Sequence, residues 1–433
     1  MERLIFKQLE EWKNKKNRKP LIIQGARQVG KTWVMKEFGK RYFENTVYIN
    51  FENNPGMKSV FEGDFDIKRI ISALKIESGK NFYSENTLLI FDEIQEVPQA
   101  LTSLKYFCEN APEYSIVAAG SLLGVALHHG TSFPVGKVNF LHLYPLNFYE
   151  FLLATGNKNL AELLGNQDFE MINAFSHKFT DLLKKYYFVG GMPEAVQCYI
   201  ESDDFTQVRK IQNELLIYYE NDFSKHAPQE TIPRIQMVWN SIPSQLAKEN
   251  RKFIYGIIRE GARAKDFELA IQWLRDSGLV HKSYRVKKPA IPLISYVELS
   301  SFKLFFSDIG LLAAKSNLSA KVLLEGNSVF EEFKGALTEQ FVAQELCAGE
   351  NELYYYSTEN SSGEIDFLLQ KDSYCIPIEV KAEENLKARS LKAFCQKYNP
   401  EIALRSSMSN YRKESWLCNV PLYALAAYIS HLE

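Results

Sequence analysis

The sequence predicts an α/β protein that begins with a parallel sheet and its crossover helices. Between residues 21 and 149, short apolar runs such as PLIIQ, NTVYINF, TLLIFDE, YSIVAAGS and KVNFLHL alternate with longer helical stretches. This alternation is typical of parallel strands that are joined by helices. The chain has 433 residues, which is too many for one ordinary hydrophobic core, so further domains are expected after the sheet.

Composition narrows the class of protein. Hydrophobic residues make up 46% of the chain and charged residues 24%, which is typical of a globular protein that folds throughout. The net charge of −2 argues against a uniformly cationic surface for nucleic acid. The six cysteines include no C-x-x-C pair, so we expect free thiols and no zinc site. No apolar run is long enough for a membrane span, and we expect a cytoplasmic protein without a membrane partner.

The order of elements divides the chain into four predicted domains. After the sheet domain of residues 1–150, a helical pattern over residues 151–226 predicts a small lid. The segment APQETIP then forms a linker, because it contains two prolines among polar residues. Three helices and a hairpin over residues 227–322 have the order of a winged helix. A final α/β segment covers residues 323–433.

The loop GARQVGKT carries the clearest functional signal. It fits the pattern G-x-x-x-x-G-K-S/T between a strand and a helix, the context that a P-loop requires and that a chance glycine loop lacks. In such a loop, backbone N–H groups surround phosphate, Lys31 reaches the outer phosphates and Thr32 ligates magnesium. We predict that the nucleotide contacts Gly25, Ala26, Arg27, Gln28, Val29, Gly30, Lys31, Thr32 and Trp33.

Polar residues that follow two later strands complete the predicted nucleotide site. The apolar run TLLIFDE ends in Asp92 and Glu93. We expect Asp92 to hold the magnesium shell and Glu93 to orient and deprotonate the attacking water, although two acids can also mark an ordinary strand exit. Ser121 follows the next strand and is a candidate for contact with the γ-phosphate, or for a simple cap or turn. Together these residues predict nucleoside triphosphate hydrolysis.

These motifs, together with AAGS, LYPLNFYEFL, YFVGGMPEAV, KLFFSDIGLL and GEIDFLL…PIEVK, resemble a group of AAA+ superfamily ATPases of bacteria and archaea. Its members join a P-loop domain to a C-terminal domain of uncharacterised function. The resemblance extends over nearly the whole chain and implies ATP with magnesium as the cofactors. It also implies Asp92 and Glu93 as the magnesium and water residues, and Ser121 as the sensor position.

The chain departs from this group in its arginines. Such proteins often carry an arginine just before LYPLNFYEFL, where this chain has Lys137, and no arginine occurs between Arg69 and Arg209. An arginine finger is worth about 10³ to 10⁵ in rate, and lysine lacks its planar fork of donors. We therefore expect slow or partner-stimulated turnover, with another subunit of an oligomer as one candidate source of the arginine. Arg27 is the only arginine that the sequence places beside the phosphates.

The segment GEIDFLLQKDSYCIPIEVKA predicts a β-hairpin that gathers charged residues. Asp366 lies on its first strand, and Glu379 and Lys381 lie on one face of its second strand. With Glu339 on the preceding helix, they resemble the D…E-x-K signature of restriction-endonuclease-like cores. Asp366 and Glu379 would hold a second magnesium ion, and Lys381 would orient water for phosphodiester cleavage. The alternatives are a solvated face, a cross-strand ion pair, or a fold that binds without cutting.

Basic residues gather at the predicted wing, whose sequence is HKSYRVKK. A winged helix commonly places such residues on DNA phosphates. Acidic residues on the would-be recognition helix, among them Asp266, Glu268 and Asp276, favour instead a solvated or protein-binding surface. DNA and a protein client are thus the two candidate macromolecular partners.

Three functions are open at this point. The favoured one is an ATP-binding and ATP-hydrolysing AAA+ switch whose nucleotide state controls the winged helix and the nuclease-like domain. The second is a nucleotide-dependent interaction module with a catalytically silent C-terminal core. The third is an ATP-gated, magnesium-dependent DNA nuclease.

Overall fold

The computed structural model describes residues 1–120, 133–248, 251–325, 331–358, 363–383 and 388–432. The chain forms two compact units. The first contains Glu2–Tyr144 and Asp276–Gly278, and the second contains Pro145–Arg275 and Leu279–Glu433 together with Met1. Apart from Asp276–Gly278, the segments predicted as lid, winged helix and nuclease-like domain therefore belong to the second unit.

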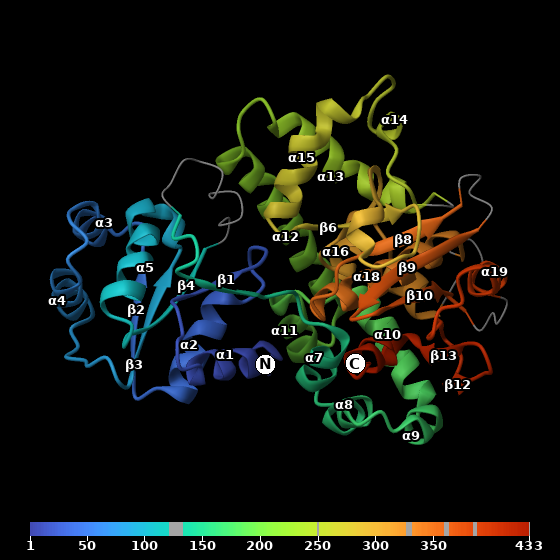
Figure 1. The fold of residues 1–433 in the computed structure, drawn as a ribbon, viewed down its shortest axis with the longest axis horizontal. Coiled ribbons are helices and arrows are strands. Elements are labelled where there is room, and N and C mark those ends of the chain that lie inside the picture. The colour runs from blue at the N-terminus through green and yellow to red at the C-terminus, as the bar shows by residue number, and fades with distance from the viewer. Residues whose placement is uncertain (121–132, 249–250, 326–330, 359–362, 384–387, 433) are drawn as a thin grey trace. The chain divides into compact units, whose positions relative to one another are not determined.

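The first unit is built on the predicted parallel sheet (Figure 1). Its strand order is β2-β3-β4-β1-β5, and every neighbouring pair is parallel. The carboxyl ends of all strands consequently lie at one edge, where α/β proteins bind ligands. The strands are β1 (Leu21–Gln24), β2 (Asn45–Asn50), β3 (Thr87–Asp92), β4 (Ser115–Ala119) and β5 (Asn139–His142).

Local signals set the helix boundaries of the first unit. Helix α3 has Pro55 in its first turn, and the Asn54 side chain accepts from the Met57 N–H, both common at helix starts. Helix α4 is capped by Asp66 and ends at Gly79, which has φ of 63°. The helices are α1 (Ile5–Asn14), α2 (Lys31–Tyr42), α3 (Pro55–Glu62), α4 (Ile67–Ser78) and α5 (Pro98–Asn110), with a 3-10 turn η1 (Ile94–Glu96).

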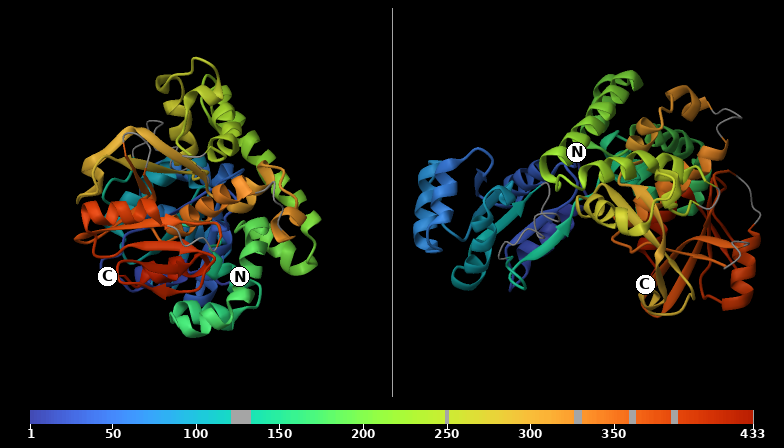
Figure 2. Two further views of the ribbon diagram at one scale, coloured as in Figure 1. Left: turned by 90° about the vertical axis from the view of Figure 1, so that its right-hand side faces the viewer. Right: turned by 90° about the horizontal axis from the view of Figure 1, so that it is seen from above.

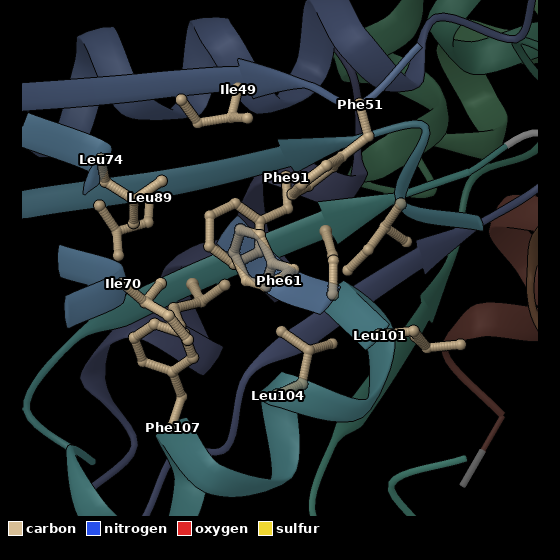
Figure 3. Packing of buried hydrophobic residues seen from close by; sticks show 14 of the residues in the cluster. Ile49, Phe51, Phe61, Ile70, Leu74, Leu89, Phe91, Leu101, Leu104 and Phe107 are labelled. Atoms are coloured by element: carbon tan, nitrogen blue, oxygen red, sulfur yellow. The ribbon is translucent and has the colours of Figure 1, made fainter. Parts of the chain in front are cut away.

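A cluster of buried side chains joins α3, α4 and α5 to the sheet (Figure 3). At its centre, the ring of Phe91 on β3 meets those of Phe51, Phe61 and Phe107 edge-on, with centroids 5.6, 5.8 and 6.2 Å away. Such pairs add to the stabilisation by burial. Because all six residues of β3 are buried, this core fixes the end of the strand, where Asp92 lies.

The second unit begins with a run of helices, α7 to α15, and its later helices are interspersed with strands. Helix α12 ends at His226 and α13 begins at Ile232, so the first five residues of APQETIP separate two helices and the last two begin α13. The helices are α7 (Phe148–Ala154), α8 (Lys158–Gly165), α9 (Phe169–Ala174), α10 (Ser176–Val189), α11 (Pro193–Ser202), α12 (Phe205–His226), α13 (Ile232–Leu246), α14 (Tyr255–Ile258), α15 (Ala264–Asp276), α16 (Ile309–Lys315), α17 (Ala320–Glu325), α18 (Glu331–Ala348), α19 (Arg389–Tyr398) and α20 (Leu425–Ser430).

A second sheet organises the rest of the second unit (Figures 1 and 2). It has eight strands in the order β12-β13-β11-β10-β9-β8-β6-β7. Strand β6 pairs with β7 in antiparallel orientation and with β8 in parallel orientation. The hairpin that the sequence predicts as a wing is thus continuous with the C-terminal strands. The strands are β6 (Val280–Val286), β7 (Val297–Phe306), β8 (Tyr354–Ser357), β9 (Glu364–Lys371), β10 (Tyr374–Val380), β11 (Leu404–Ser407), β12 (Arg412–Lys413) and β13 (Cys418–Pro421).

The structure alters the interpretation of the segment predicted as a winged helix. Three helices followed by a hairpin are present in the predicted order. However, β6 is an interior strand with a partner on each side, because the β8 backbone pairs with the side that a projecting wing would leave open. A separate winged-helix domain stays a prediction.

Three motifs of the resemblance meet inside the second unit. The Leu146 N–H donates to the Gly191 carbonyl at 2.7 Å, and the Tyr186 hydroxyl donates to the Leu146 carbonyl at 2.5 Å. The Asp308 carboxylate accepts from the Gly191 N–H at 2.6 Å and from the Leu311 N–H at 2.9 Å. The second of these hydrogen bonds caps helix α16. Buried polar groups require such partners. The motifs LYPLNFYEFL, YFVGGMPEAV and KLFFSDIGLL thus contribute to the packing of this unit.

Gly191→Ala should lower the thermal midpoint of the chain, with a loss of about 1–3 kcal/mol for forcing a methyl group into a packed interior. A Cβ at this position would lie 2.0 Å from the Leu146 carbonyl oxygen, which is backbone and cannot rotate away. Thermal denaturation checks this expectation. Gly165→Ala is the matched control, because the nearest atom to its Cβ is 3.6 Å away. An equal midpoint for both variants would contradict the prediction.

Glu345→Gln should remove a pH dependence of stability. The Glu345 carboxyl accepts from the Phe148 N–H at 2.7 Å, and burial, reinforced by Glu150, raises its pKa to about 8. The folded chain therefore keeps a proton that the unfolded chain releases above its ordinary pKa of 4.5, so stability falls as pH rises from about 4.5 through about 8. The difference in thermal midpoint, variant minus wild type, should grow between pH 5 and pH 9. A constant difference would mean that Glu345 is ionised in the folded chain.

Candidate functional site

The loop GARQVGKT connects β1 to α2 in the first unit. Gly25 has φ of 146° and Gly30 has φ of 96°, values that favour glycine. A Cβ at Gly25 would lie 2.2 Å from the Leu143 carbonyl oxygen, so this position admits no side chain. Helix α2 begins directly at Lys31, which directs its first N–H groups and the positive end of its dipole toward the loop.

The Lys31 ammonium is held against the loop backbone. It donates to the Gly25 carbonyl at 2.9 Å and to the Ala26 carbonyl at 2.8 Å. Burial lowers the pKa of Lys31 to about 8, although Glu93 and Asp92 partly oppose this shift. A phosphate group would favour the charged form of this amine, so the loop and its lysine suit a polyphosphate anion.

The two predicted magnesium ligands lie together. The Thr32 hydroxyl donates to Asp92 Oδ2 at 2.7 Å, and the Tyr48 hydroxyl donates to the same oxygen at 2.9 Å. The Glu93 N–H donates to Asp92 Oδ1 at 3.1 Å. Magnesium in nucleotide sites usually takes one or two protein ligands together with phosphate oxygens and water. The hydroxyl of Thr32 and the carboxylate of Asp92 fit this requirement.

Glu93 is placed next to these ligands in an unusual backbone conformation. Its φ of 49° lies in the left-handed region, which costs energy for a residue other than glycine and is found mostly at functional sites. The Gln95 side-chain amide donates to Glu93 Oε2 at 2.6 Å. The Glu93 carboxylate is therefore oriented by η1, on the turn that follows β3.

Two residues at this site carry no sequence signal. Tyr48, on β2, orients Asp92 through its hydroxyl. Arg3 is buried and donates to the carbonyls of Val29 at 3.1 Å and Tyr144 at 2.5 Å. Arg3 therefore joins Arg27 near the phosphate loop, although the sequence pointed to Arg27 alone. Sheet pairing and tertiary packing bring Tyr48 and Arg3 to the site, and neither belongs to a local motif.

Three other residues that the sequence associates with the nucleotide site are Trp33, Lys137 and Ser121. Trp33 is partly exposed, and its ring meets Phe6 edge-on at 6.1 Å. Lys137 forms an ion pair with Glu109 of α5 at 2.9 Å, so its charge is already partnered. Ser121 lies outside the described residues.

The charged residues of the C-terminal hairpin are also brought together. Strands β9 and β10 pair in antiparallel register, with Ile378 opposite Phe367. The Lys381 ammonium lies 2.8 Å from Glu379 Oε1, and the Val380 N–H donates to Asp366 Oδ2 at 2.7 Å. The two carboxylates and the lysine thus lie around the end of β10, as the alternation of the strands predicts.

Two cations from outside the D…E-x-K pattern lie against these carboxylates. The Arg251 guanidinium is 2.5 Å from Glu339 Oε1. The Lys303 ammonium lies 3.4 Å from Glu339 Oε2 and 2.5 Å from Glu364 Oε1. Burial would raise the pKa of Glu339, but Arg251 and Lys303 outweigh it and lower that pKa. Burial raises the pKa of Asp366, and the negative charge of Glu339 adds to this effect.

This arrangement does not fit a magnesium site made of Glu339, Asp366 and Glu379. Both oxygens of Glu339 already face a cation. In the part of the chain that the structure describes, no group of three or more His, Cys, Asp or Glu side chains is positioned to hold a metal ion. The nucleotide site differs in this respect, because ATP itself would supply most of the oxygen ligands there.

Two basic residues of the predicted wing, Lys282 and Arg285, are engaged within the sheet, whereas Lys287 and Lys288 follow β6 and are exposed. Arg285 forms an ion pair with Glu298 at 2.9 Å and donates to the Ser357 carbonyl at 2.7 Å. Lys282 lies over the ring of Phe302, 3.9 Å from its centroid. These contacts reduce the cationic surface that β6 offers to DNA.

The fold and the site of the first unit define a class of protein. A parallel sheet with a glycine-rich loop after β1 and an Asp-Glu pair after β3 is the arrangement of P-loop nucleotide-binding domains. Residues 17–152 match the profile of the AAA domain family, which supports a P-loop ATPase domain of the AAA class and nucleotide-dependent activity. Two domains of unknown function match the second unit: DUF8612 over residues 180–322 and DUF4143 over residues 334–425.

Solved structures give more distant likenesses. The Walker-type ATPase of Pyrococcus abyssi is 14% identical, with 72% of this chain and 94% of that chain covered and a TM-score of 0.43. The Orc1 protein of Aeropyrum pernix, solved in complex with DNA, is 13% identical over 72% and 91% of the two chains, with a TM-score of 0.27. Cdc6p of Pyrobaculum aerophilum is 12% identical over 74% and 93%, with a TM-score of 0.25. At these TM-scores the likenesses support no inference about function.

No curated protein matches the sequence. None of the described helices combines the length and the hydropathy needed to cross a lipid bilayer.

Proposed function

We propose that the first unit binds and hydrolyses ATP with magnesium, and that its nucleotide state controls the second unit. The observation that carries this proposal is the meeting of Lys31, Thr32 and Asp92 at one end of the parallel sheet, with Glu93 beside them. These groups come from the loop after β1 and from the end of β3, and each has a role in ATP hydrolysis.

The roles follow from the chemistry of the groups. The loop N–H groups and Lys31 bind the β- and γ-phosphates, and Thr32 and Asp92 would hold magnesium, which neutralises charge on the phosphates when bound. Glu93 orients the attacking water and accepts its proton. Gln95 positions the Glu93 carboxylate, and Tyr48 positions that of Asp92. The left-handed backbone at Glu93 is stable because β3 on one side and η1 on the other hold it.

Turnover should be slow without a partner. Lys137, at the position where the resemblance suggests an arginine, pairs with Glu109. Arg3 is buried beneath the loop, where it donates to backbone carbonyls. We propose that an additional positive charge for the transition state comes from a second subunit or from a client, in line with the large effect of arginine fingers.

For the second unit we propose a nuclease-like fold that binds a client without cutting nucleic acid. The β9–β10 hairpin with Asp366, Glu379 and Lys381 supports the fold. The cations beside Glu339 oppose a catalytic metal, and the engagement of Lys282 and Arg285 within the sheet favours a protein client over DNA. The ATP-gated nuclease is the second candidate, since Glu379 Oε2 is buried without a hydrogen-bond partner in the described part of the chain.

One assay tests both parts of this proposal. Purified full-length protein is incubated with ATP, magnesium or manganese, and supercoiled plasmid, and both phosphate release and plasmid integrity are followed. We expect measurable ATP hydrolysis and an intact plasmid. Absence of hydrolysis would contradict the ATPase proposal. Plasmid cleavage that disappears in Asp366→Asn would instead establish the nuclease.

A further inference from the structure

We infer that Lys303 and Arg251 are the resident cations of a buried carboxylate cluster, and that this cluster fastens strand β7 to the C-terminal segment instead of binding a divalent metal ion. The carboxylate cluster consists of Glu339, Glu364 and Asp366. The inference deepens the proposed function, because it rests on the nuclease-like fold proposed for the second unit and gives a physical reason for that fold not to cut nucleic acid.

The Lys303 ammonium lies between two carboxylates of the cluster. The Lys303 side chain has no solvent exposure. Its ammonium lies 2.5 Å from Glu364 Oε1 and 3.4 Å from Glu339 Oε2, with the Tyr355 ring on another side, 4.9 Å from the centroid. An ammonium group without solvent is stable only when carboxylates compensate its charge. Lys303 therefore depends on the carboxylate of Glu339, which a metal ion at this site would also require.

Arg251 completes the compensation from a different segment of the chain. Its guanidinium lies 2.5 Å from Glu339 Oε1, and its side chain is mostly buried. Each oxygen of Glu339 consequently faces a different cation. A divalent ion beside these oxygens would meet two positive charges at short range in a medium of low dielectric constant, where repulsion is strong.

The origins of the charged residues explain what the cluster does. Lys303 belongs to β7, Glu339 to α18, and Glu364 and Asp366 to β9. Strand β7 lies at the edge of the sheet and does not pair with β9. The ion pairs thus join an edge strand to a helix and a strand from later in the sequence. Breaking a buried pair on one side leaves an uncompensated charge, so the cations hold these elements together.

Manganese binding to the full-length chain, measured without nucleotide by electron paramagnetic resonance and calorimetry, tests the inference. We expect Asp366→Asn to leave any Mn²⁺ binding by the wild-type chain unchanged. Lys303→Met keeps the size of the side chain and removes its charge, so this variant should gain one Mn²⁺ per chain and a higher thermal midpoint when Mn²⁺ is added. Both gains should disappear in Lys303→Met combined with Asp366→Asn.

Matched variants separate this result from other metal sites. Lys282→Met removes a lysine of β6 that lies over the Phe302 ring and outside the cluster, and it should gain no Mn²⁺. Asp92→Asn identifies any Mn²⁺ held at the nucleotide site.

Two results would overturn the inference. One is a Mn²⁺ site in the wild-type chain that Asp366→Asn removes and Asp92→Asn leaves intact. This result can be obtained without any Lys303 variant. The other is a folded Lys303→Met chain that binds no Mn²⁺. A failure of ATP hydrolysis would contradict the proposed function alone, because the Mn²⁺ measurements contain no nucleotide.

Discussion

Glu93→Gln should lower the turnover number for ATP by about 10²- to 10⁴-fold, the usual contribution of a positioned general base. The amide has nearly the size of the carboxylate but does not accept a proton from water. ATP affinity should change little, because Lys31, Thr32 and Asp92 keep their contacts. Phosphate release gives the turnover number, and equilibrium binding of a fluorescent ATP analogue gives the affinity.

Glu96→Gln is the control for this result. Glu96 lies on the same turn, η1, but its side chain is exposed. Turnover in this variant should equal that of the wild type. If Glu93→Gln also retained full turnover, the water would have to be activated by another group, and the role proposed for Glu93 would be wrong.

Lys31→Ala should weaken ATP binding by about 10- to 100-fold, the equivalent of one hydrogen bond to a charged group, and abolish measurable hydrolysis. Arg27→Ala should have a smaller effect on both. The Lys31 ammonium lies inside the loop, against the Gly25 and Ala26 carbonyls, whereas the sequence places Arg27 at a position that more often contacts the rim or a partner.

The same binding and hydrolysis assays compare these variants. Lys40→Ala, at an exposed position near the end of α2, is the control for the loss of a positive charge. Equal losses in Arg27→Ala and Lys31→Ala would mean that Arg27 belongs to the catalytic machinery.

Local patterns predicted the first unit better than the second. The phosphate loop and the Asp92-Glu93 pair are contiguous motifs at strand ends, and a parallel sheet brings its strand ends to one edge whatever the details of packing. Tyr48 and Arg3 could not be found in this way. Tyr48 reaches Asp92 because β2 pairs with β3, and Arg3 reaches the loop from the segment before α1.

The C-terminal charges illustrate a different limit. Asp366, Glu379 and Lys381 were predicted to lie together because a hairpin has a fixed side-chain alternation. Lys303 lies in the run SSFKLFF, which is typical of a strand with one polar face. Lys303 is buried because α18, β9 and β8 place Glu339, Glu364 and Tyr355 around it. These elements join the β6–β7 hairpin through the parallel pairing of β6 with β8, whose facing ends are separated by 67 intervening residues. Pairing between strands so distant in sequence is not determined by local propensity.

The pairing of β6 with β8 also determines what would happen if the chain were split into two fragments. A cut after residue 322, where the sequence suggested a domain boundary, would separate these two strands and expose the backbone of β6 along one side. A bare strand edge readily recruits other chains, and the Lys303 charge would lose its carboxylates in the same step. Neither fragment should therefore behave as a well-dispersed monomer, whereas the two fragments produced together should reassociate through the missing strand pair.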